Sequence, residues 1–328
     1  MLEIKNLSVC LKSKANKTYT LVKNLSYKLE AGQTVAIVGE SGCGKTIHAL
    51  AIMGLLPPNI KISQGEILLE NKNILLLPPK ERRKINGKDI ALVFQDALTS
   101  LNPVMTIREH LLEVFADRTK LYLDEAEEEI SKILQQVELP ERVLDSYPHQ
   151  LSGGQRQRIM IALALILNPK VLIADEPTTA LDEDTQKQIL ALIKKLQKKR
   201  KMSVIFITHD LMLAKEIADK ICVLYSGIKL EEGASNDIFT NPLHPYTYCL
   251  IRSIITEETV KGKPLFEIQG MPAKNGTRFY GCPFQNRCKK TTKVCIKFQP
   301  SLEELRPKHF AACFWAKSVN SQRRQNEL

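Results

Sequence analysis

Residues 39–46, which read GESGCGKT, constrain the fold of this chain more than any other stretch. They follow an apolar run over residues 34–38 and precede a helix-like segment over residues 47–55. A buried strand, a loop of the form GxxxxGK[ST] and a helix in this order are typical of a phosphate-binding loop, or P-loop. The predicted loop consists of Gly39, Glu40, Ser41, Gly42, Cys43, Gly44, Lys45 and Thr46.

A P-loop predicts how a nucleoside triphosphate is held. Its glycines let backbone N–H groups turn toward the α- and β-phosphates, and the helix that follows presents its positive end to them. We expect Lys45 to reach the β- and γ-phosphates and the Thr46 hydroxyl to bind Mg²⁺. The sequence therefore predicts ATP and Mg²⁺ as ligands.

A second apolar strand is predicted over residues 171–174 and runs directly into two carboxylates, Asp175 and Glu176. A strand that is apolar throughout is typical of a parallel sheet with both faces buried, where the chemistry lies at the carboxyl end. An acidic pair there can also be a loop start or a helix cap. After a P-loop, we expect Asp175 to hold the Mg²⁺ shell and Glu176 to orient or deprotonate the attacking water.

The pentapeptide LSGGQ at residues 151–155 lies between these two motifs. Alone it indicates a helix start with a serine cap. Together, the three motifs in this order resemble the nucleotide-binding subunit of an ABC transporter, and the resemblance covers roughly residues 1–235. It implies an α/β fold of the P-loop NTPase class, with a RecA-like core, an antiparallel β subdomain and a helical subdomain at about residues 96–165.

The same resemblance implies further site residues. In this family LSGGQ binds the γ-phosphate of ATP held on the partner's P-loop, which implies that role for Ser152, Gly153, Gly154 and Gln155. The glutamine that contacts Mg²⁺ and the attacking water corresponds to Gln95. The loop that crosses the dimer interface corresponds to residues 180–182, where Asp182 can also cap a helix. The histidine that contacts the γ-phosphate corresponds to His209.

Tyr19 is a candidate for stacking on the adenine ring. Its spacing from Lys45 is shorter than in the family, so a tyrosine that merely belongs to a β-strand is an alternative.

Two segments narrow the resemblance to one branch. Residues 96–103 are similar to the corresponding stretch in ATPase subunits of oligopeptide and dipeptide permeases and of their nickel-importing relatives. Residues 241–247, NPLHPYT, resemble the HPY segment that begins the C-terminal extension of that group. By itself, this segment indicates a proline-rich boundary before a short helix. We therefore expect a small second domain over residues 236–328.

Four cysteines, Cys282, Cys288, Cys295 and Cys313, fall in this predicted second domain. Their spacing lacks the CxxC pairs of most structural zinc sites, and disulfides are disfavoured in a cytosolic chain. Four thiolates can hold a [4Fe-4S] cluster without such pairs. Zinc and free thiols remain open from spacing alone. The resemblance favours the cluster, because peptide-permease ATPases carry a similar cysteine set and some of them bind [4Fe-4S].

Charge and hydropathy bear on location and partners. The chain of 328 residues carries a net charge of +11, but its densest basic run, residues 194–201, reads as a solvated helix end without the aromatic residues that stack on bases. We therefore expect no nucleic-acid partner. Its start lacks the features of an export signal, and no apolar run approaches the ~20 residues of a membrane span. The expected location is the cytoplasmic face of the bacterial membrane, reached through partners.

These observations predict an ATP-hydrolysing subunit of a bacterial ABC importer for di- and oligopeptides. The family implies a second ATPase subunit, in a heterodimer, together with two transmembrane permeases and an extracellular or periplasmic substrate-binding protein. A nickel or metal-chelate importer of the same branch is the first alternative. A soluble ABC ATPase without a transport role is the second, although the chain has only one P-loop and one LSGGQ.

Overall fold

The computed structural model describes residues 1–14, 17–95, 97–118, 122–179, 181–254, 266–273 and 276–318. Asp96 and Ala180 of the predicted motifs lie outside these residues. The chain divides into two compact units, each assembled from separate segments. The helical unit consists of Met1–Leu2, Leu29–Gln33 and Leu69–Phe206. The P-loop unit consists of Glu3–Lys28, Thr34–Leu68 and Ile207–Leu328.

Three neighbouring strands of the helical unit run in the order β8, β7, β6. They are β6 (Ile90–Val93), β7 (Val171–Asp175) and β8 (Ser203–Thr208), and β6 and β7 pair in parallel. Every residue of β7 and β8 is buried, which explains why both read as unbroken apolar runs. The predicted strand before the acidic pair is therefore confirmed, with Asp175 as its last residue.

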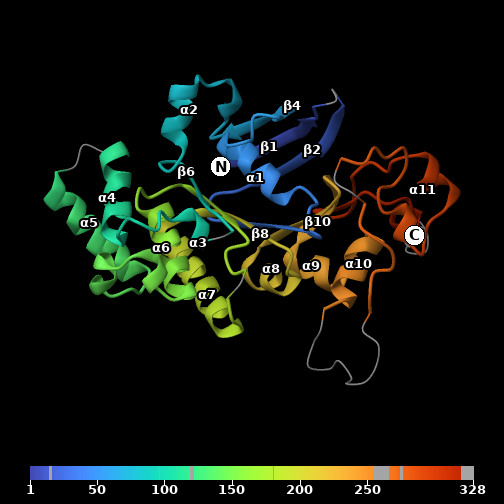
Figure 1. Cartoon of the computed structure of the whole chain (residues 1–328). Helices are drawn as coiled ribbons and strands as arrows, with labels where there is room; N and C mark the ends of the chain where they lie inside the picture. Colours follow the sequence, from blue (N-terminus) through green and yellow to red (C-terminus); the bar gives the residue numbers. More distant parts are fainter. Residues whose placement is uncertain are drawn as a thin grey trace. The chain divides into compact units, whose positions relative to one another are not determined.

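Most other described elements of the helical unit are helices. The long ones are α4 (Ile107–Arg118), α5 (Leu123–Gln136), α6 (Gly153–Leu165) and α7 (Glu183–Arg200). The short elements are β5 (Lys72–Asn73), η1 (Ile74–Leu76), α2 (Pro79–Ile85), α3 (Ala97–Ser100), η2 (Glu141–Asp145) and η3 (Pro148–Gln150). Helices α4, α5 and α6 pack on one another (Figure 1). On α5, the buried side chains Ala126, Ile130, Ile133 and Leu134 form a stripe at helical spacing.

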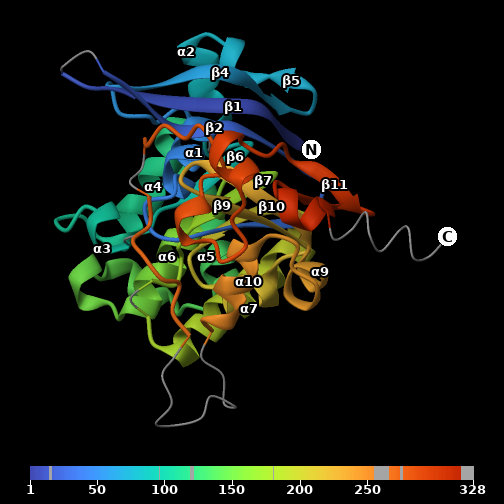
Figure 2. The same ribbon diagram turned by 90° about the vertical axis from the view of Figure 1, so that its right-hand side faces the viewer.

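The P-loop unit contains two groups of strands. In one, β1 (Leu2–Lys12) lies between β2 (Thr18–Leu29) and β4 (Ile60–Leu69), as Figure 2 shows. The other runs in the order β11, β12, β10, β9, β3. Its members are β3 (Thr34–Val38), β9 (Lys220–Tyr225), β10 (Ile228–Ala234), β11 (Glu303–Arg306) and β12 (His309–Ala311). Only the pair of β3 and β9 is parallel; β10 pairs antiparallel with both β9 and β12.

The helices of the P-loop unit are short. They are α1 (Lys45–Met53), α8 (Leu211–Ile217), α9 (Ser235–Thr240), α10 (Pro245–Arg252), η4 (Gln285–Arg287) and α11 (Lys293–Lys297). The proline-rich segment does lead into a short helix, since His244 caps α10 by accepting a hydrogen bond from the Tyr246 N–H at 3.0 Å. In the residues that the structure describes, no helix is long and apolar enough to cross a membrane.

One apolar core joins the P-loop strand to the C-terminal extension. It contains Val38 of β3, Val223 of β9 and Leu250 of α10, and it continues into Cys282 and Phe284. The extension also belongs to the same compact unit as the P-loop. A separate small C-terminal domain, as expected from the sequence, is therefore not confirmed.

A buried carboxylate fixes the extension to the sheet. Glu231 of β10 is fully buried and accepts hydrogen bonds from the backbone N–H groups of Leu243 and His244 at 2.7 and 2.9 Å. Its side chain also pairs with His309 Nε2 of β12 at 2.7 Å. A buried carboxylate is costly unless it is hydrogen-bonded in this way. Glu231 thus ties the HPY segment and strand β12 to one point of β10.

Candidate active site

The P-loop connects β3 to α1 and depends on glycine at two positions. Gly39 has φ +155°, and a Cβ there would lie 2.2 Å from the Leu224 carbonyl oxygen. Gly44 has φ +102°, and a Cβ there would lie 2.9 Å from the Leu21 carbonyl oxygen. A larger residue at either position would force the backbone apart. The loop conformation predicted from GESGCGKT therefore has a direct steric basis.

Lys45 holds the loop closed. The residue is 5% exposed, and its ammonium group donates hydrogen bonds to the Gly39 carbonyl at 2.8 Å and the Glu40 carbonyl at 3.2 Å. Ser41 and Thr46 are exposed, whereas Cys43 is buried, and burial raises the pKa of its thiol. A thiol with a raised pKa is a poor nucleophile, so Cys43 packs as part of the loop. A concave loop with a lysine ammonium and an exposed hydroxyl at the start of a helix suits a polyphosphate with its Mg²⁺.

At the end of β7, the Glu176 carboxylate is held on two sides. Gln95 Nε2 and Thr179 Oγ1 donate hydrogen bonds to its Oε2 at 3.0 and 3.1 Å. Glu176 itself adopts φ +47°, a left-handed conformation that is rare for a non-glycine residue and that costs energy. Such local strain is frequent at functional sites. Neighbouring Asp175 is buried at the last position of the strand.

Thr179 is a contact of Glu176 that sequence reasoning did not single out. The structure brings together Gln95 and Glu176, which are 81 positions apart in sequence. The only signal for Thr179 in the sequence was its position: it lies three residues after Glu176 and directly before the predicted loop at residues 180–182. An oriented carboxylate with an amide and a hydroxyl beside it can position a water molecule and accept its proton.

The LSGGQ motif forms the beginning of α6. Ser152 caps the helix: its Oγ accepts from the Gln155 N–H at 3.2 Å, and Gln155 Oε1 accepts from the Ser152 N–H at 2.9 Å. Gly154 packs closely against α7: a Cβ at this position would lie 2.8 Å from Thr185 Cγ2. The motif therefore serves both as a cap and as a close contact between two helices.

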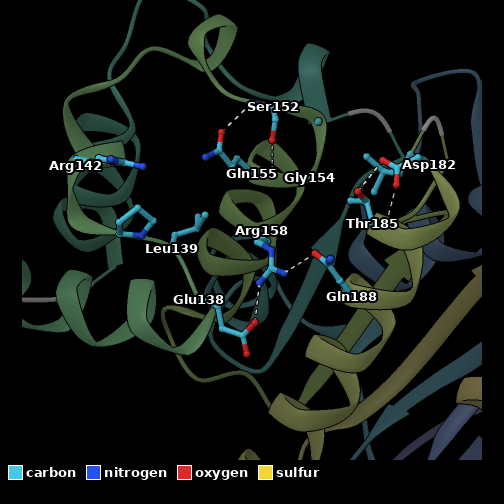
Figure 3. Close-up of a pocket in the computed structure, with 13 residues that line it drawn as sticks. Glu138, Leu139, Arg142, Ser152, Gly154, Gln155, Arg158, Asp182, Thr185 and Gln188 are labelled. Atoms are coloured by element: carbon cyan, nitrogen blue, oxygen red, sulfur yellow. Dashed lines mark hydrogen bonds and ion pairs between the residues drawn. The ribbon is translucent and has the colours of Figure 1, made fainter.

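A pocket of about 470 Å³ opens beside this helix start (Figure 3). Ser152 and Gln155 lie on one side of it, with Arg142 and Leu139 on another. Arg158 also lines it and donates to Glu138 at 3.1 Å and to Gln188 at 3.3 Å. A helix N-terminus together with two arginines favours an anion. Sequence reasoning missed Arg142 and Arg158, since neither belongs to a motif.

Asp182 lines the same pocket and caps α7. Its carboxylate accepts from the Thr185 hydroxyl at 2.7 Å and from the Thr185 N–H at 2.9 Å. The side-chain hydrogen bond from Thr185, followed by the backbone one, lowers the pKa of this carboxyl group. The helix-cap interpretation is confirmed, and a role at a dimer interface stays a prediction.

Two further predicted residues belong to the P-loop unit. His209 is exposed and follows β8 directly. Tyr19 lies in β2, is 38% exposed, and packs closely against the chain at Gly276, where a Cβ would lie 2.8 Å from Tyr19 Cβ. Stacking of Tyr19 on adenine stays a prediction.

Comparison with protein-family models gives two matches that cover different parts of the chain. Residues 22–179 match the model described as ABC transporter. Residues 230–295 match the model described as the C-terminal region of oligopeptide/dipeptide transporters. The chain is also 43% identical to the dipeptide transport ATP-binding protein DppD of Bacillus subtilis, over 96% of this chain and 94% of that protein.

The chain belongs to the ATP-binding proteins of ABC transporters, in the oligopeptide/dipeptide group. The oligopeptide transport ATP-binding protein OppD of Escherichia coli is 41% identical over 96% of this chain and 93% of its own length. Among solved structures, the dimeric bacterial ABC transporter cassette MJ0796 aligns with a TM-score of 0.64 and 32% identity. The alignment covers 72% of this chain and 99% of the cassette. A post-hydrolysis dimer of that cassette bound to ADP and Pi matches equally well.

The family settles the class of reaction. The protein is an ABC ATPase that binds ATP through a P-loop α/β fold. Within it, the P-loop conformation and the anchored Glu176 carboxylate described above suit that activity.

The four cysteines of this ABC ATPase lie near one another. The pKa of the Cys282 thiol is raised to about 12, first by burial and further by the nearby thiols of Cys313, Cys295 and Cys288. Cys249 of α10 also lies near Cys288, a proximity that the sequence did not reveal. Within the described ranges, however, no group of three or more His, Cys, Asp or Glu side chains is arranged to hold a metal ion. The [4Fe-4S] cluster expected from the sequence is therefore not confirmed.

Proposed function

We propose that this ABC ATPase energises the uptake of di- and oligopeptides as a subunit of a bacterial importer. Support for the peptide cargo comes from the match over residues 230–295 and from relatives named for dipeptide or oligopeptide transport at about 40% identity over most of the chain. The observation that carries the hydrolytic part is the Glu176 carboxylate at a buried strand end, held by Gln95 and Thr179.

Each motif takes one part of the reaction in this proposal. The P-loop backbone and Lys45 bind the phosphates of ATP, Thr46 and Asp175 hold Mg²⁺ with help from Gln95, and Glu176 takes the proton of the attacking water. His209 contacts the γ-phosphate. Ser152 and the N–H groups of the following glycines complete the site of a partner subunit. This role is supported by the exposed Ser152 and the half-buried Gly153 and Gly154, which line an open pocket.

The proposed assembly contains a second ABC ATPase subunit in a heterodimer, two transmembrane permeases and an extracellular or periplasmic binding protein. The chain acts at the cytoplasmic face of the membrane. Residues 1–235 make up the nucleotide-binding domain, with its helical subdomain at about 96–165, and residues 236–328 make up the extension. In the described residues from 107 to 165, the elements α4, α5, η2, η3 and α6 are all helical, which supports the subdomain assignment.

The proposal includes a metal centre at Cys282, Cys288, Cys295 and Cys313, with [4Fe-4S] as the first candidate and Zn²⁺ as the second. Its support is the convergence of the four thiols, since Cys288, Cys295 and Cys313 each raise the pKa of Cys282. A bound cluster or metal ion would stabilise the fold of a segment that buries only a small apolar core. Chemical analysis of anaerobically purified full-length protein for iron, sulfide and zinc tests it. We expect Cys295→Ser to remove the metal and Cys10→Ser, in strand β1, to retain it. Protein without iron or zinc would refute the centre.

Uptake of labelled di- and oligopeptides, with nickel alongside, tests the function in cells whose own copy carries Glu176→Gln. The expected result is loss of peptide uptake with normal nickel uptake. Loss of nickel uptake alone would assign the chain to the metal branch, and loss of neither would contradict a transport role.

A further inference from the structure

Glu40 is the point at which the C-terminal extension contacts the P-loop. Arg287, the last residue of η4, forms a two-pronged ion pair with it: Nη1 lies 2.7 Å from Oε2 and Nη2 lies 3.0 Å from Oε1. The two residues are 247 positions apart in sequence. Only 5% of the Arg287 side chain and 23% of the Glu40 side chain are exposed. This is a partly buried pair, in which geometry counts for more than at a surface.

The guanidinium of Arg287 is fully engaged. Besides Glu40, it donates from Nε to the Gln269 carbonyl at 3.1 Å and from Nη2 to the Ile268 carbonyl at 3.2 Å. Its Nη1 also donates to Tyr225 Oη at 3.4 Å. Burial lowers the pKa of Arg287, but its hydrogen bonds to Glu40 and Tyr225 outweigh this and raise it. A lysine has no planar fork and cannot reproduce this set of five bonds.

The backbone of Glu40 is fixed as well. Its N–H donates to Tyr246 Oη at 3.1 Å, and its carbonyl accepts from the Lys45 ammonium at 3.2 Å. Tyr246 belongs to an aromatic cluster with Tyr225 and Phe284, whose ring centroids are 4.8 to 5.5 Å apart. Lys45 is the phosphate-binding lysine of the loop. The N–H, the carbonyl and the carboxylate of Glu40 are thus all held, two of them by residues after position 240.

We propose that Arg287 is a positioning residue for ATP binding: through Glu40 it fixes the P-loop against Lys45 and neutralises a carboxylate beside the phosphate site. The C-terminal extension is then a working part of the nucleotide site of its own chain. This inference rests on the proposed role of the P-loop. Removing Arg287 would leave the Glu40 carboxylate partly buried and unpaired, where it would repel the polyphosphate and loosen the loop.

Equilibrium binding of ATP with Mg²⁺ to the full-length chain tests the inference. We expect Arg287→Ala to weaken binding about tenfold and Arg287→Lys to weaken it by a smaller factor, since it keeps the charge without the fork. In a Glu40→Gln background the loss caused by Arg287→Ala should shrink, because the unpaired charge is gone. Arg252→Ala is the matched control. Arg252 lies exposed in α10 over the rings of Tyr248 and Phe266, and its replacement should leave the affinity unchanged.

Thermal unfolding of the same variants separates positioning from mere stability. If Arg287→Ala and Arg287→Lys lower the melting temperature but bind ATP as the wild type does, the inference is wrong, while the proposed function stands as long as Lys45→Ala still weakens ATP binding strongly. If Lys45→Ala binds ATP normally, the proposed nucleotide site fails, and the inference fails with it. A loss from Arg287→Ala of equal size in both Glu40 backgrounds would also contradict coupling through Glu40.

Discussion

The two glycine-rich motifs of this ABC ATPase are supported in different ways. The P-loop is surrounded by its own unit: backbone from Leu21 and Leu224 limits its glycines, and Arg287 and Tyr246 hold Glu40. LSGGQ is held by a local capping box and one close helix contact, and it faces an open pocket. A loop that binds its own nucleotide is preorganised by the fold. The position of LSGGQ beside an open pocket suits the proposed role of this motif in completing a partner's site.

Glu176→Gln gives the largest expected effect, because it removes a proton acceptor and leaves both glycine-rich motifs in place. We expect ATP turnover of the assembled transporter to fall about 1000-fold. ATP binding should persist, since Gln keeps the size of the side chain. Phosphate release measures turnover, and Glu183→Gln, at the exposed start of α7, is the matched control that should retain it. Normal turnover in Glu176→Gln would remove this residue from the chemistry.

Acid should weaken the P-loop unit through His48, which is buried in α1. Burial lowers its pKa to about 4 from an ordinary 6.5, and it lies between Tyr27 Oη at 2.5 Å and the Lys45 carbonyl at 3.1 Å. Because the folded pKa is the lower one, the unfolded chain binds more protons between these values, and stability is lost as pH falls from 6.5 to 4. The loss reaches about 3 kcal/mol for this group.

Urea unfolding at several pH values measures this loss. In His48→Asn, which cannot titrate in this range, stability should decline less steeply between pH 6.5 and 4. Part of the decline should remain, because burial also lowers the pKa of His244 to about 4. The same slope in wild type and His48→Asn would show that His48 is not buried in the neutral form.

Lys45→Ala tests the P-loop side of the comparison alone. We expect affinity for ATP to fall about 100-fold, because the ammonium that bridges the loop and the phosphates is lost. The change should appear in the full-length chain without any partner. An affinity within a factor of two of wild type would mean that this loop does not hold the nucleotide.

Gly154→Ala gives the smallest expected effect and tests the LSGGQ side of the comparison. The new Cβ would lie 2.8 Å from Thr185 Cγ2, and such overpacking costs about 1–3 kcal/mol, against a gain of up to about 1 kcal/mol in helix propensity. We expect a net loss of about 1 kcal/mol in the free energy of unfolding. Thr185→Ser removes the clashing methyl and keeps the hydroxyl that binds Asp182. In that background Gly154→Ala should cost nothing, and a persistent loss would point to another cause.

Local patterns predicted the elements that carry the motifs. The strand before the P-loop, the helix that follows the P-loop and the helix that begins at LSGGQ all form, within a few residues of the expected bounds. The strand is an unbroken apolar run, and the helix at LSGGQ begins with a serine cap. Such signals are contained in one stretch of chain, so they can be read without knowing its neighbours.

Contacts between distant segments left no such signal. The ion pair of Arg287 with Glu40 and the hydrogen bond of Glu231 with His309 join residues that are far apart in sequence. No periodic pattern within one segment predicts such pairs. The expected separate C-terminal domain was inferred from a proline-rich boundary, but the segment shares the core of the P-loop strand. A boundary in sequence marks where a chain changes direction, and the shared apolar surface decides which core it joins.

Ser152→Asp is the most direct test of the division between a site built by the chain itself and one completed for a partner. Aspartate caps a helix as well as serine does, so α6 should keep its stability, but a carboxylate now stands where the partner's γ-phosphate would bind. We predict unchanged ATP affinity of the isolated chain together with loss of most of the ATP turnover of the assembled transporter. Weakened affinity in the isolated chain, or full turnover in the assembly, would contradict it.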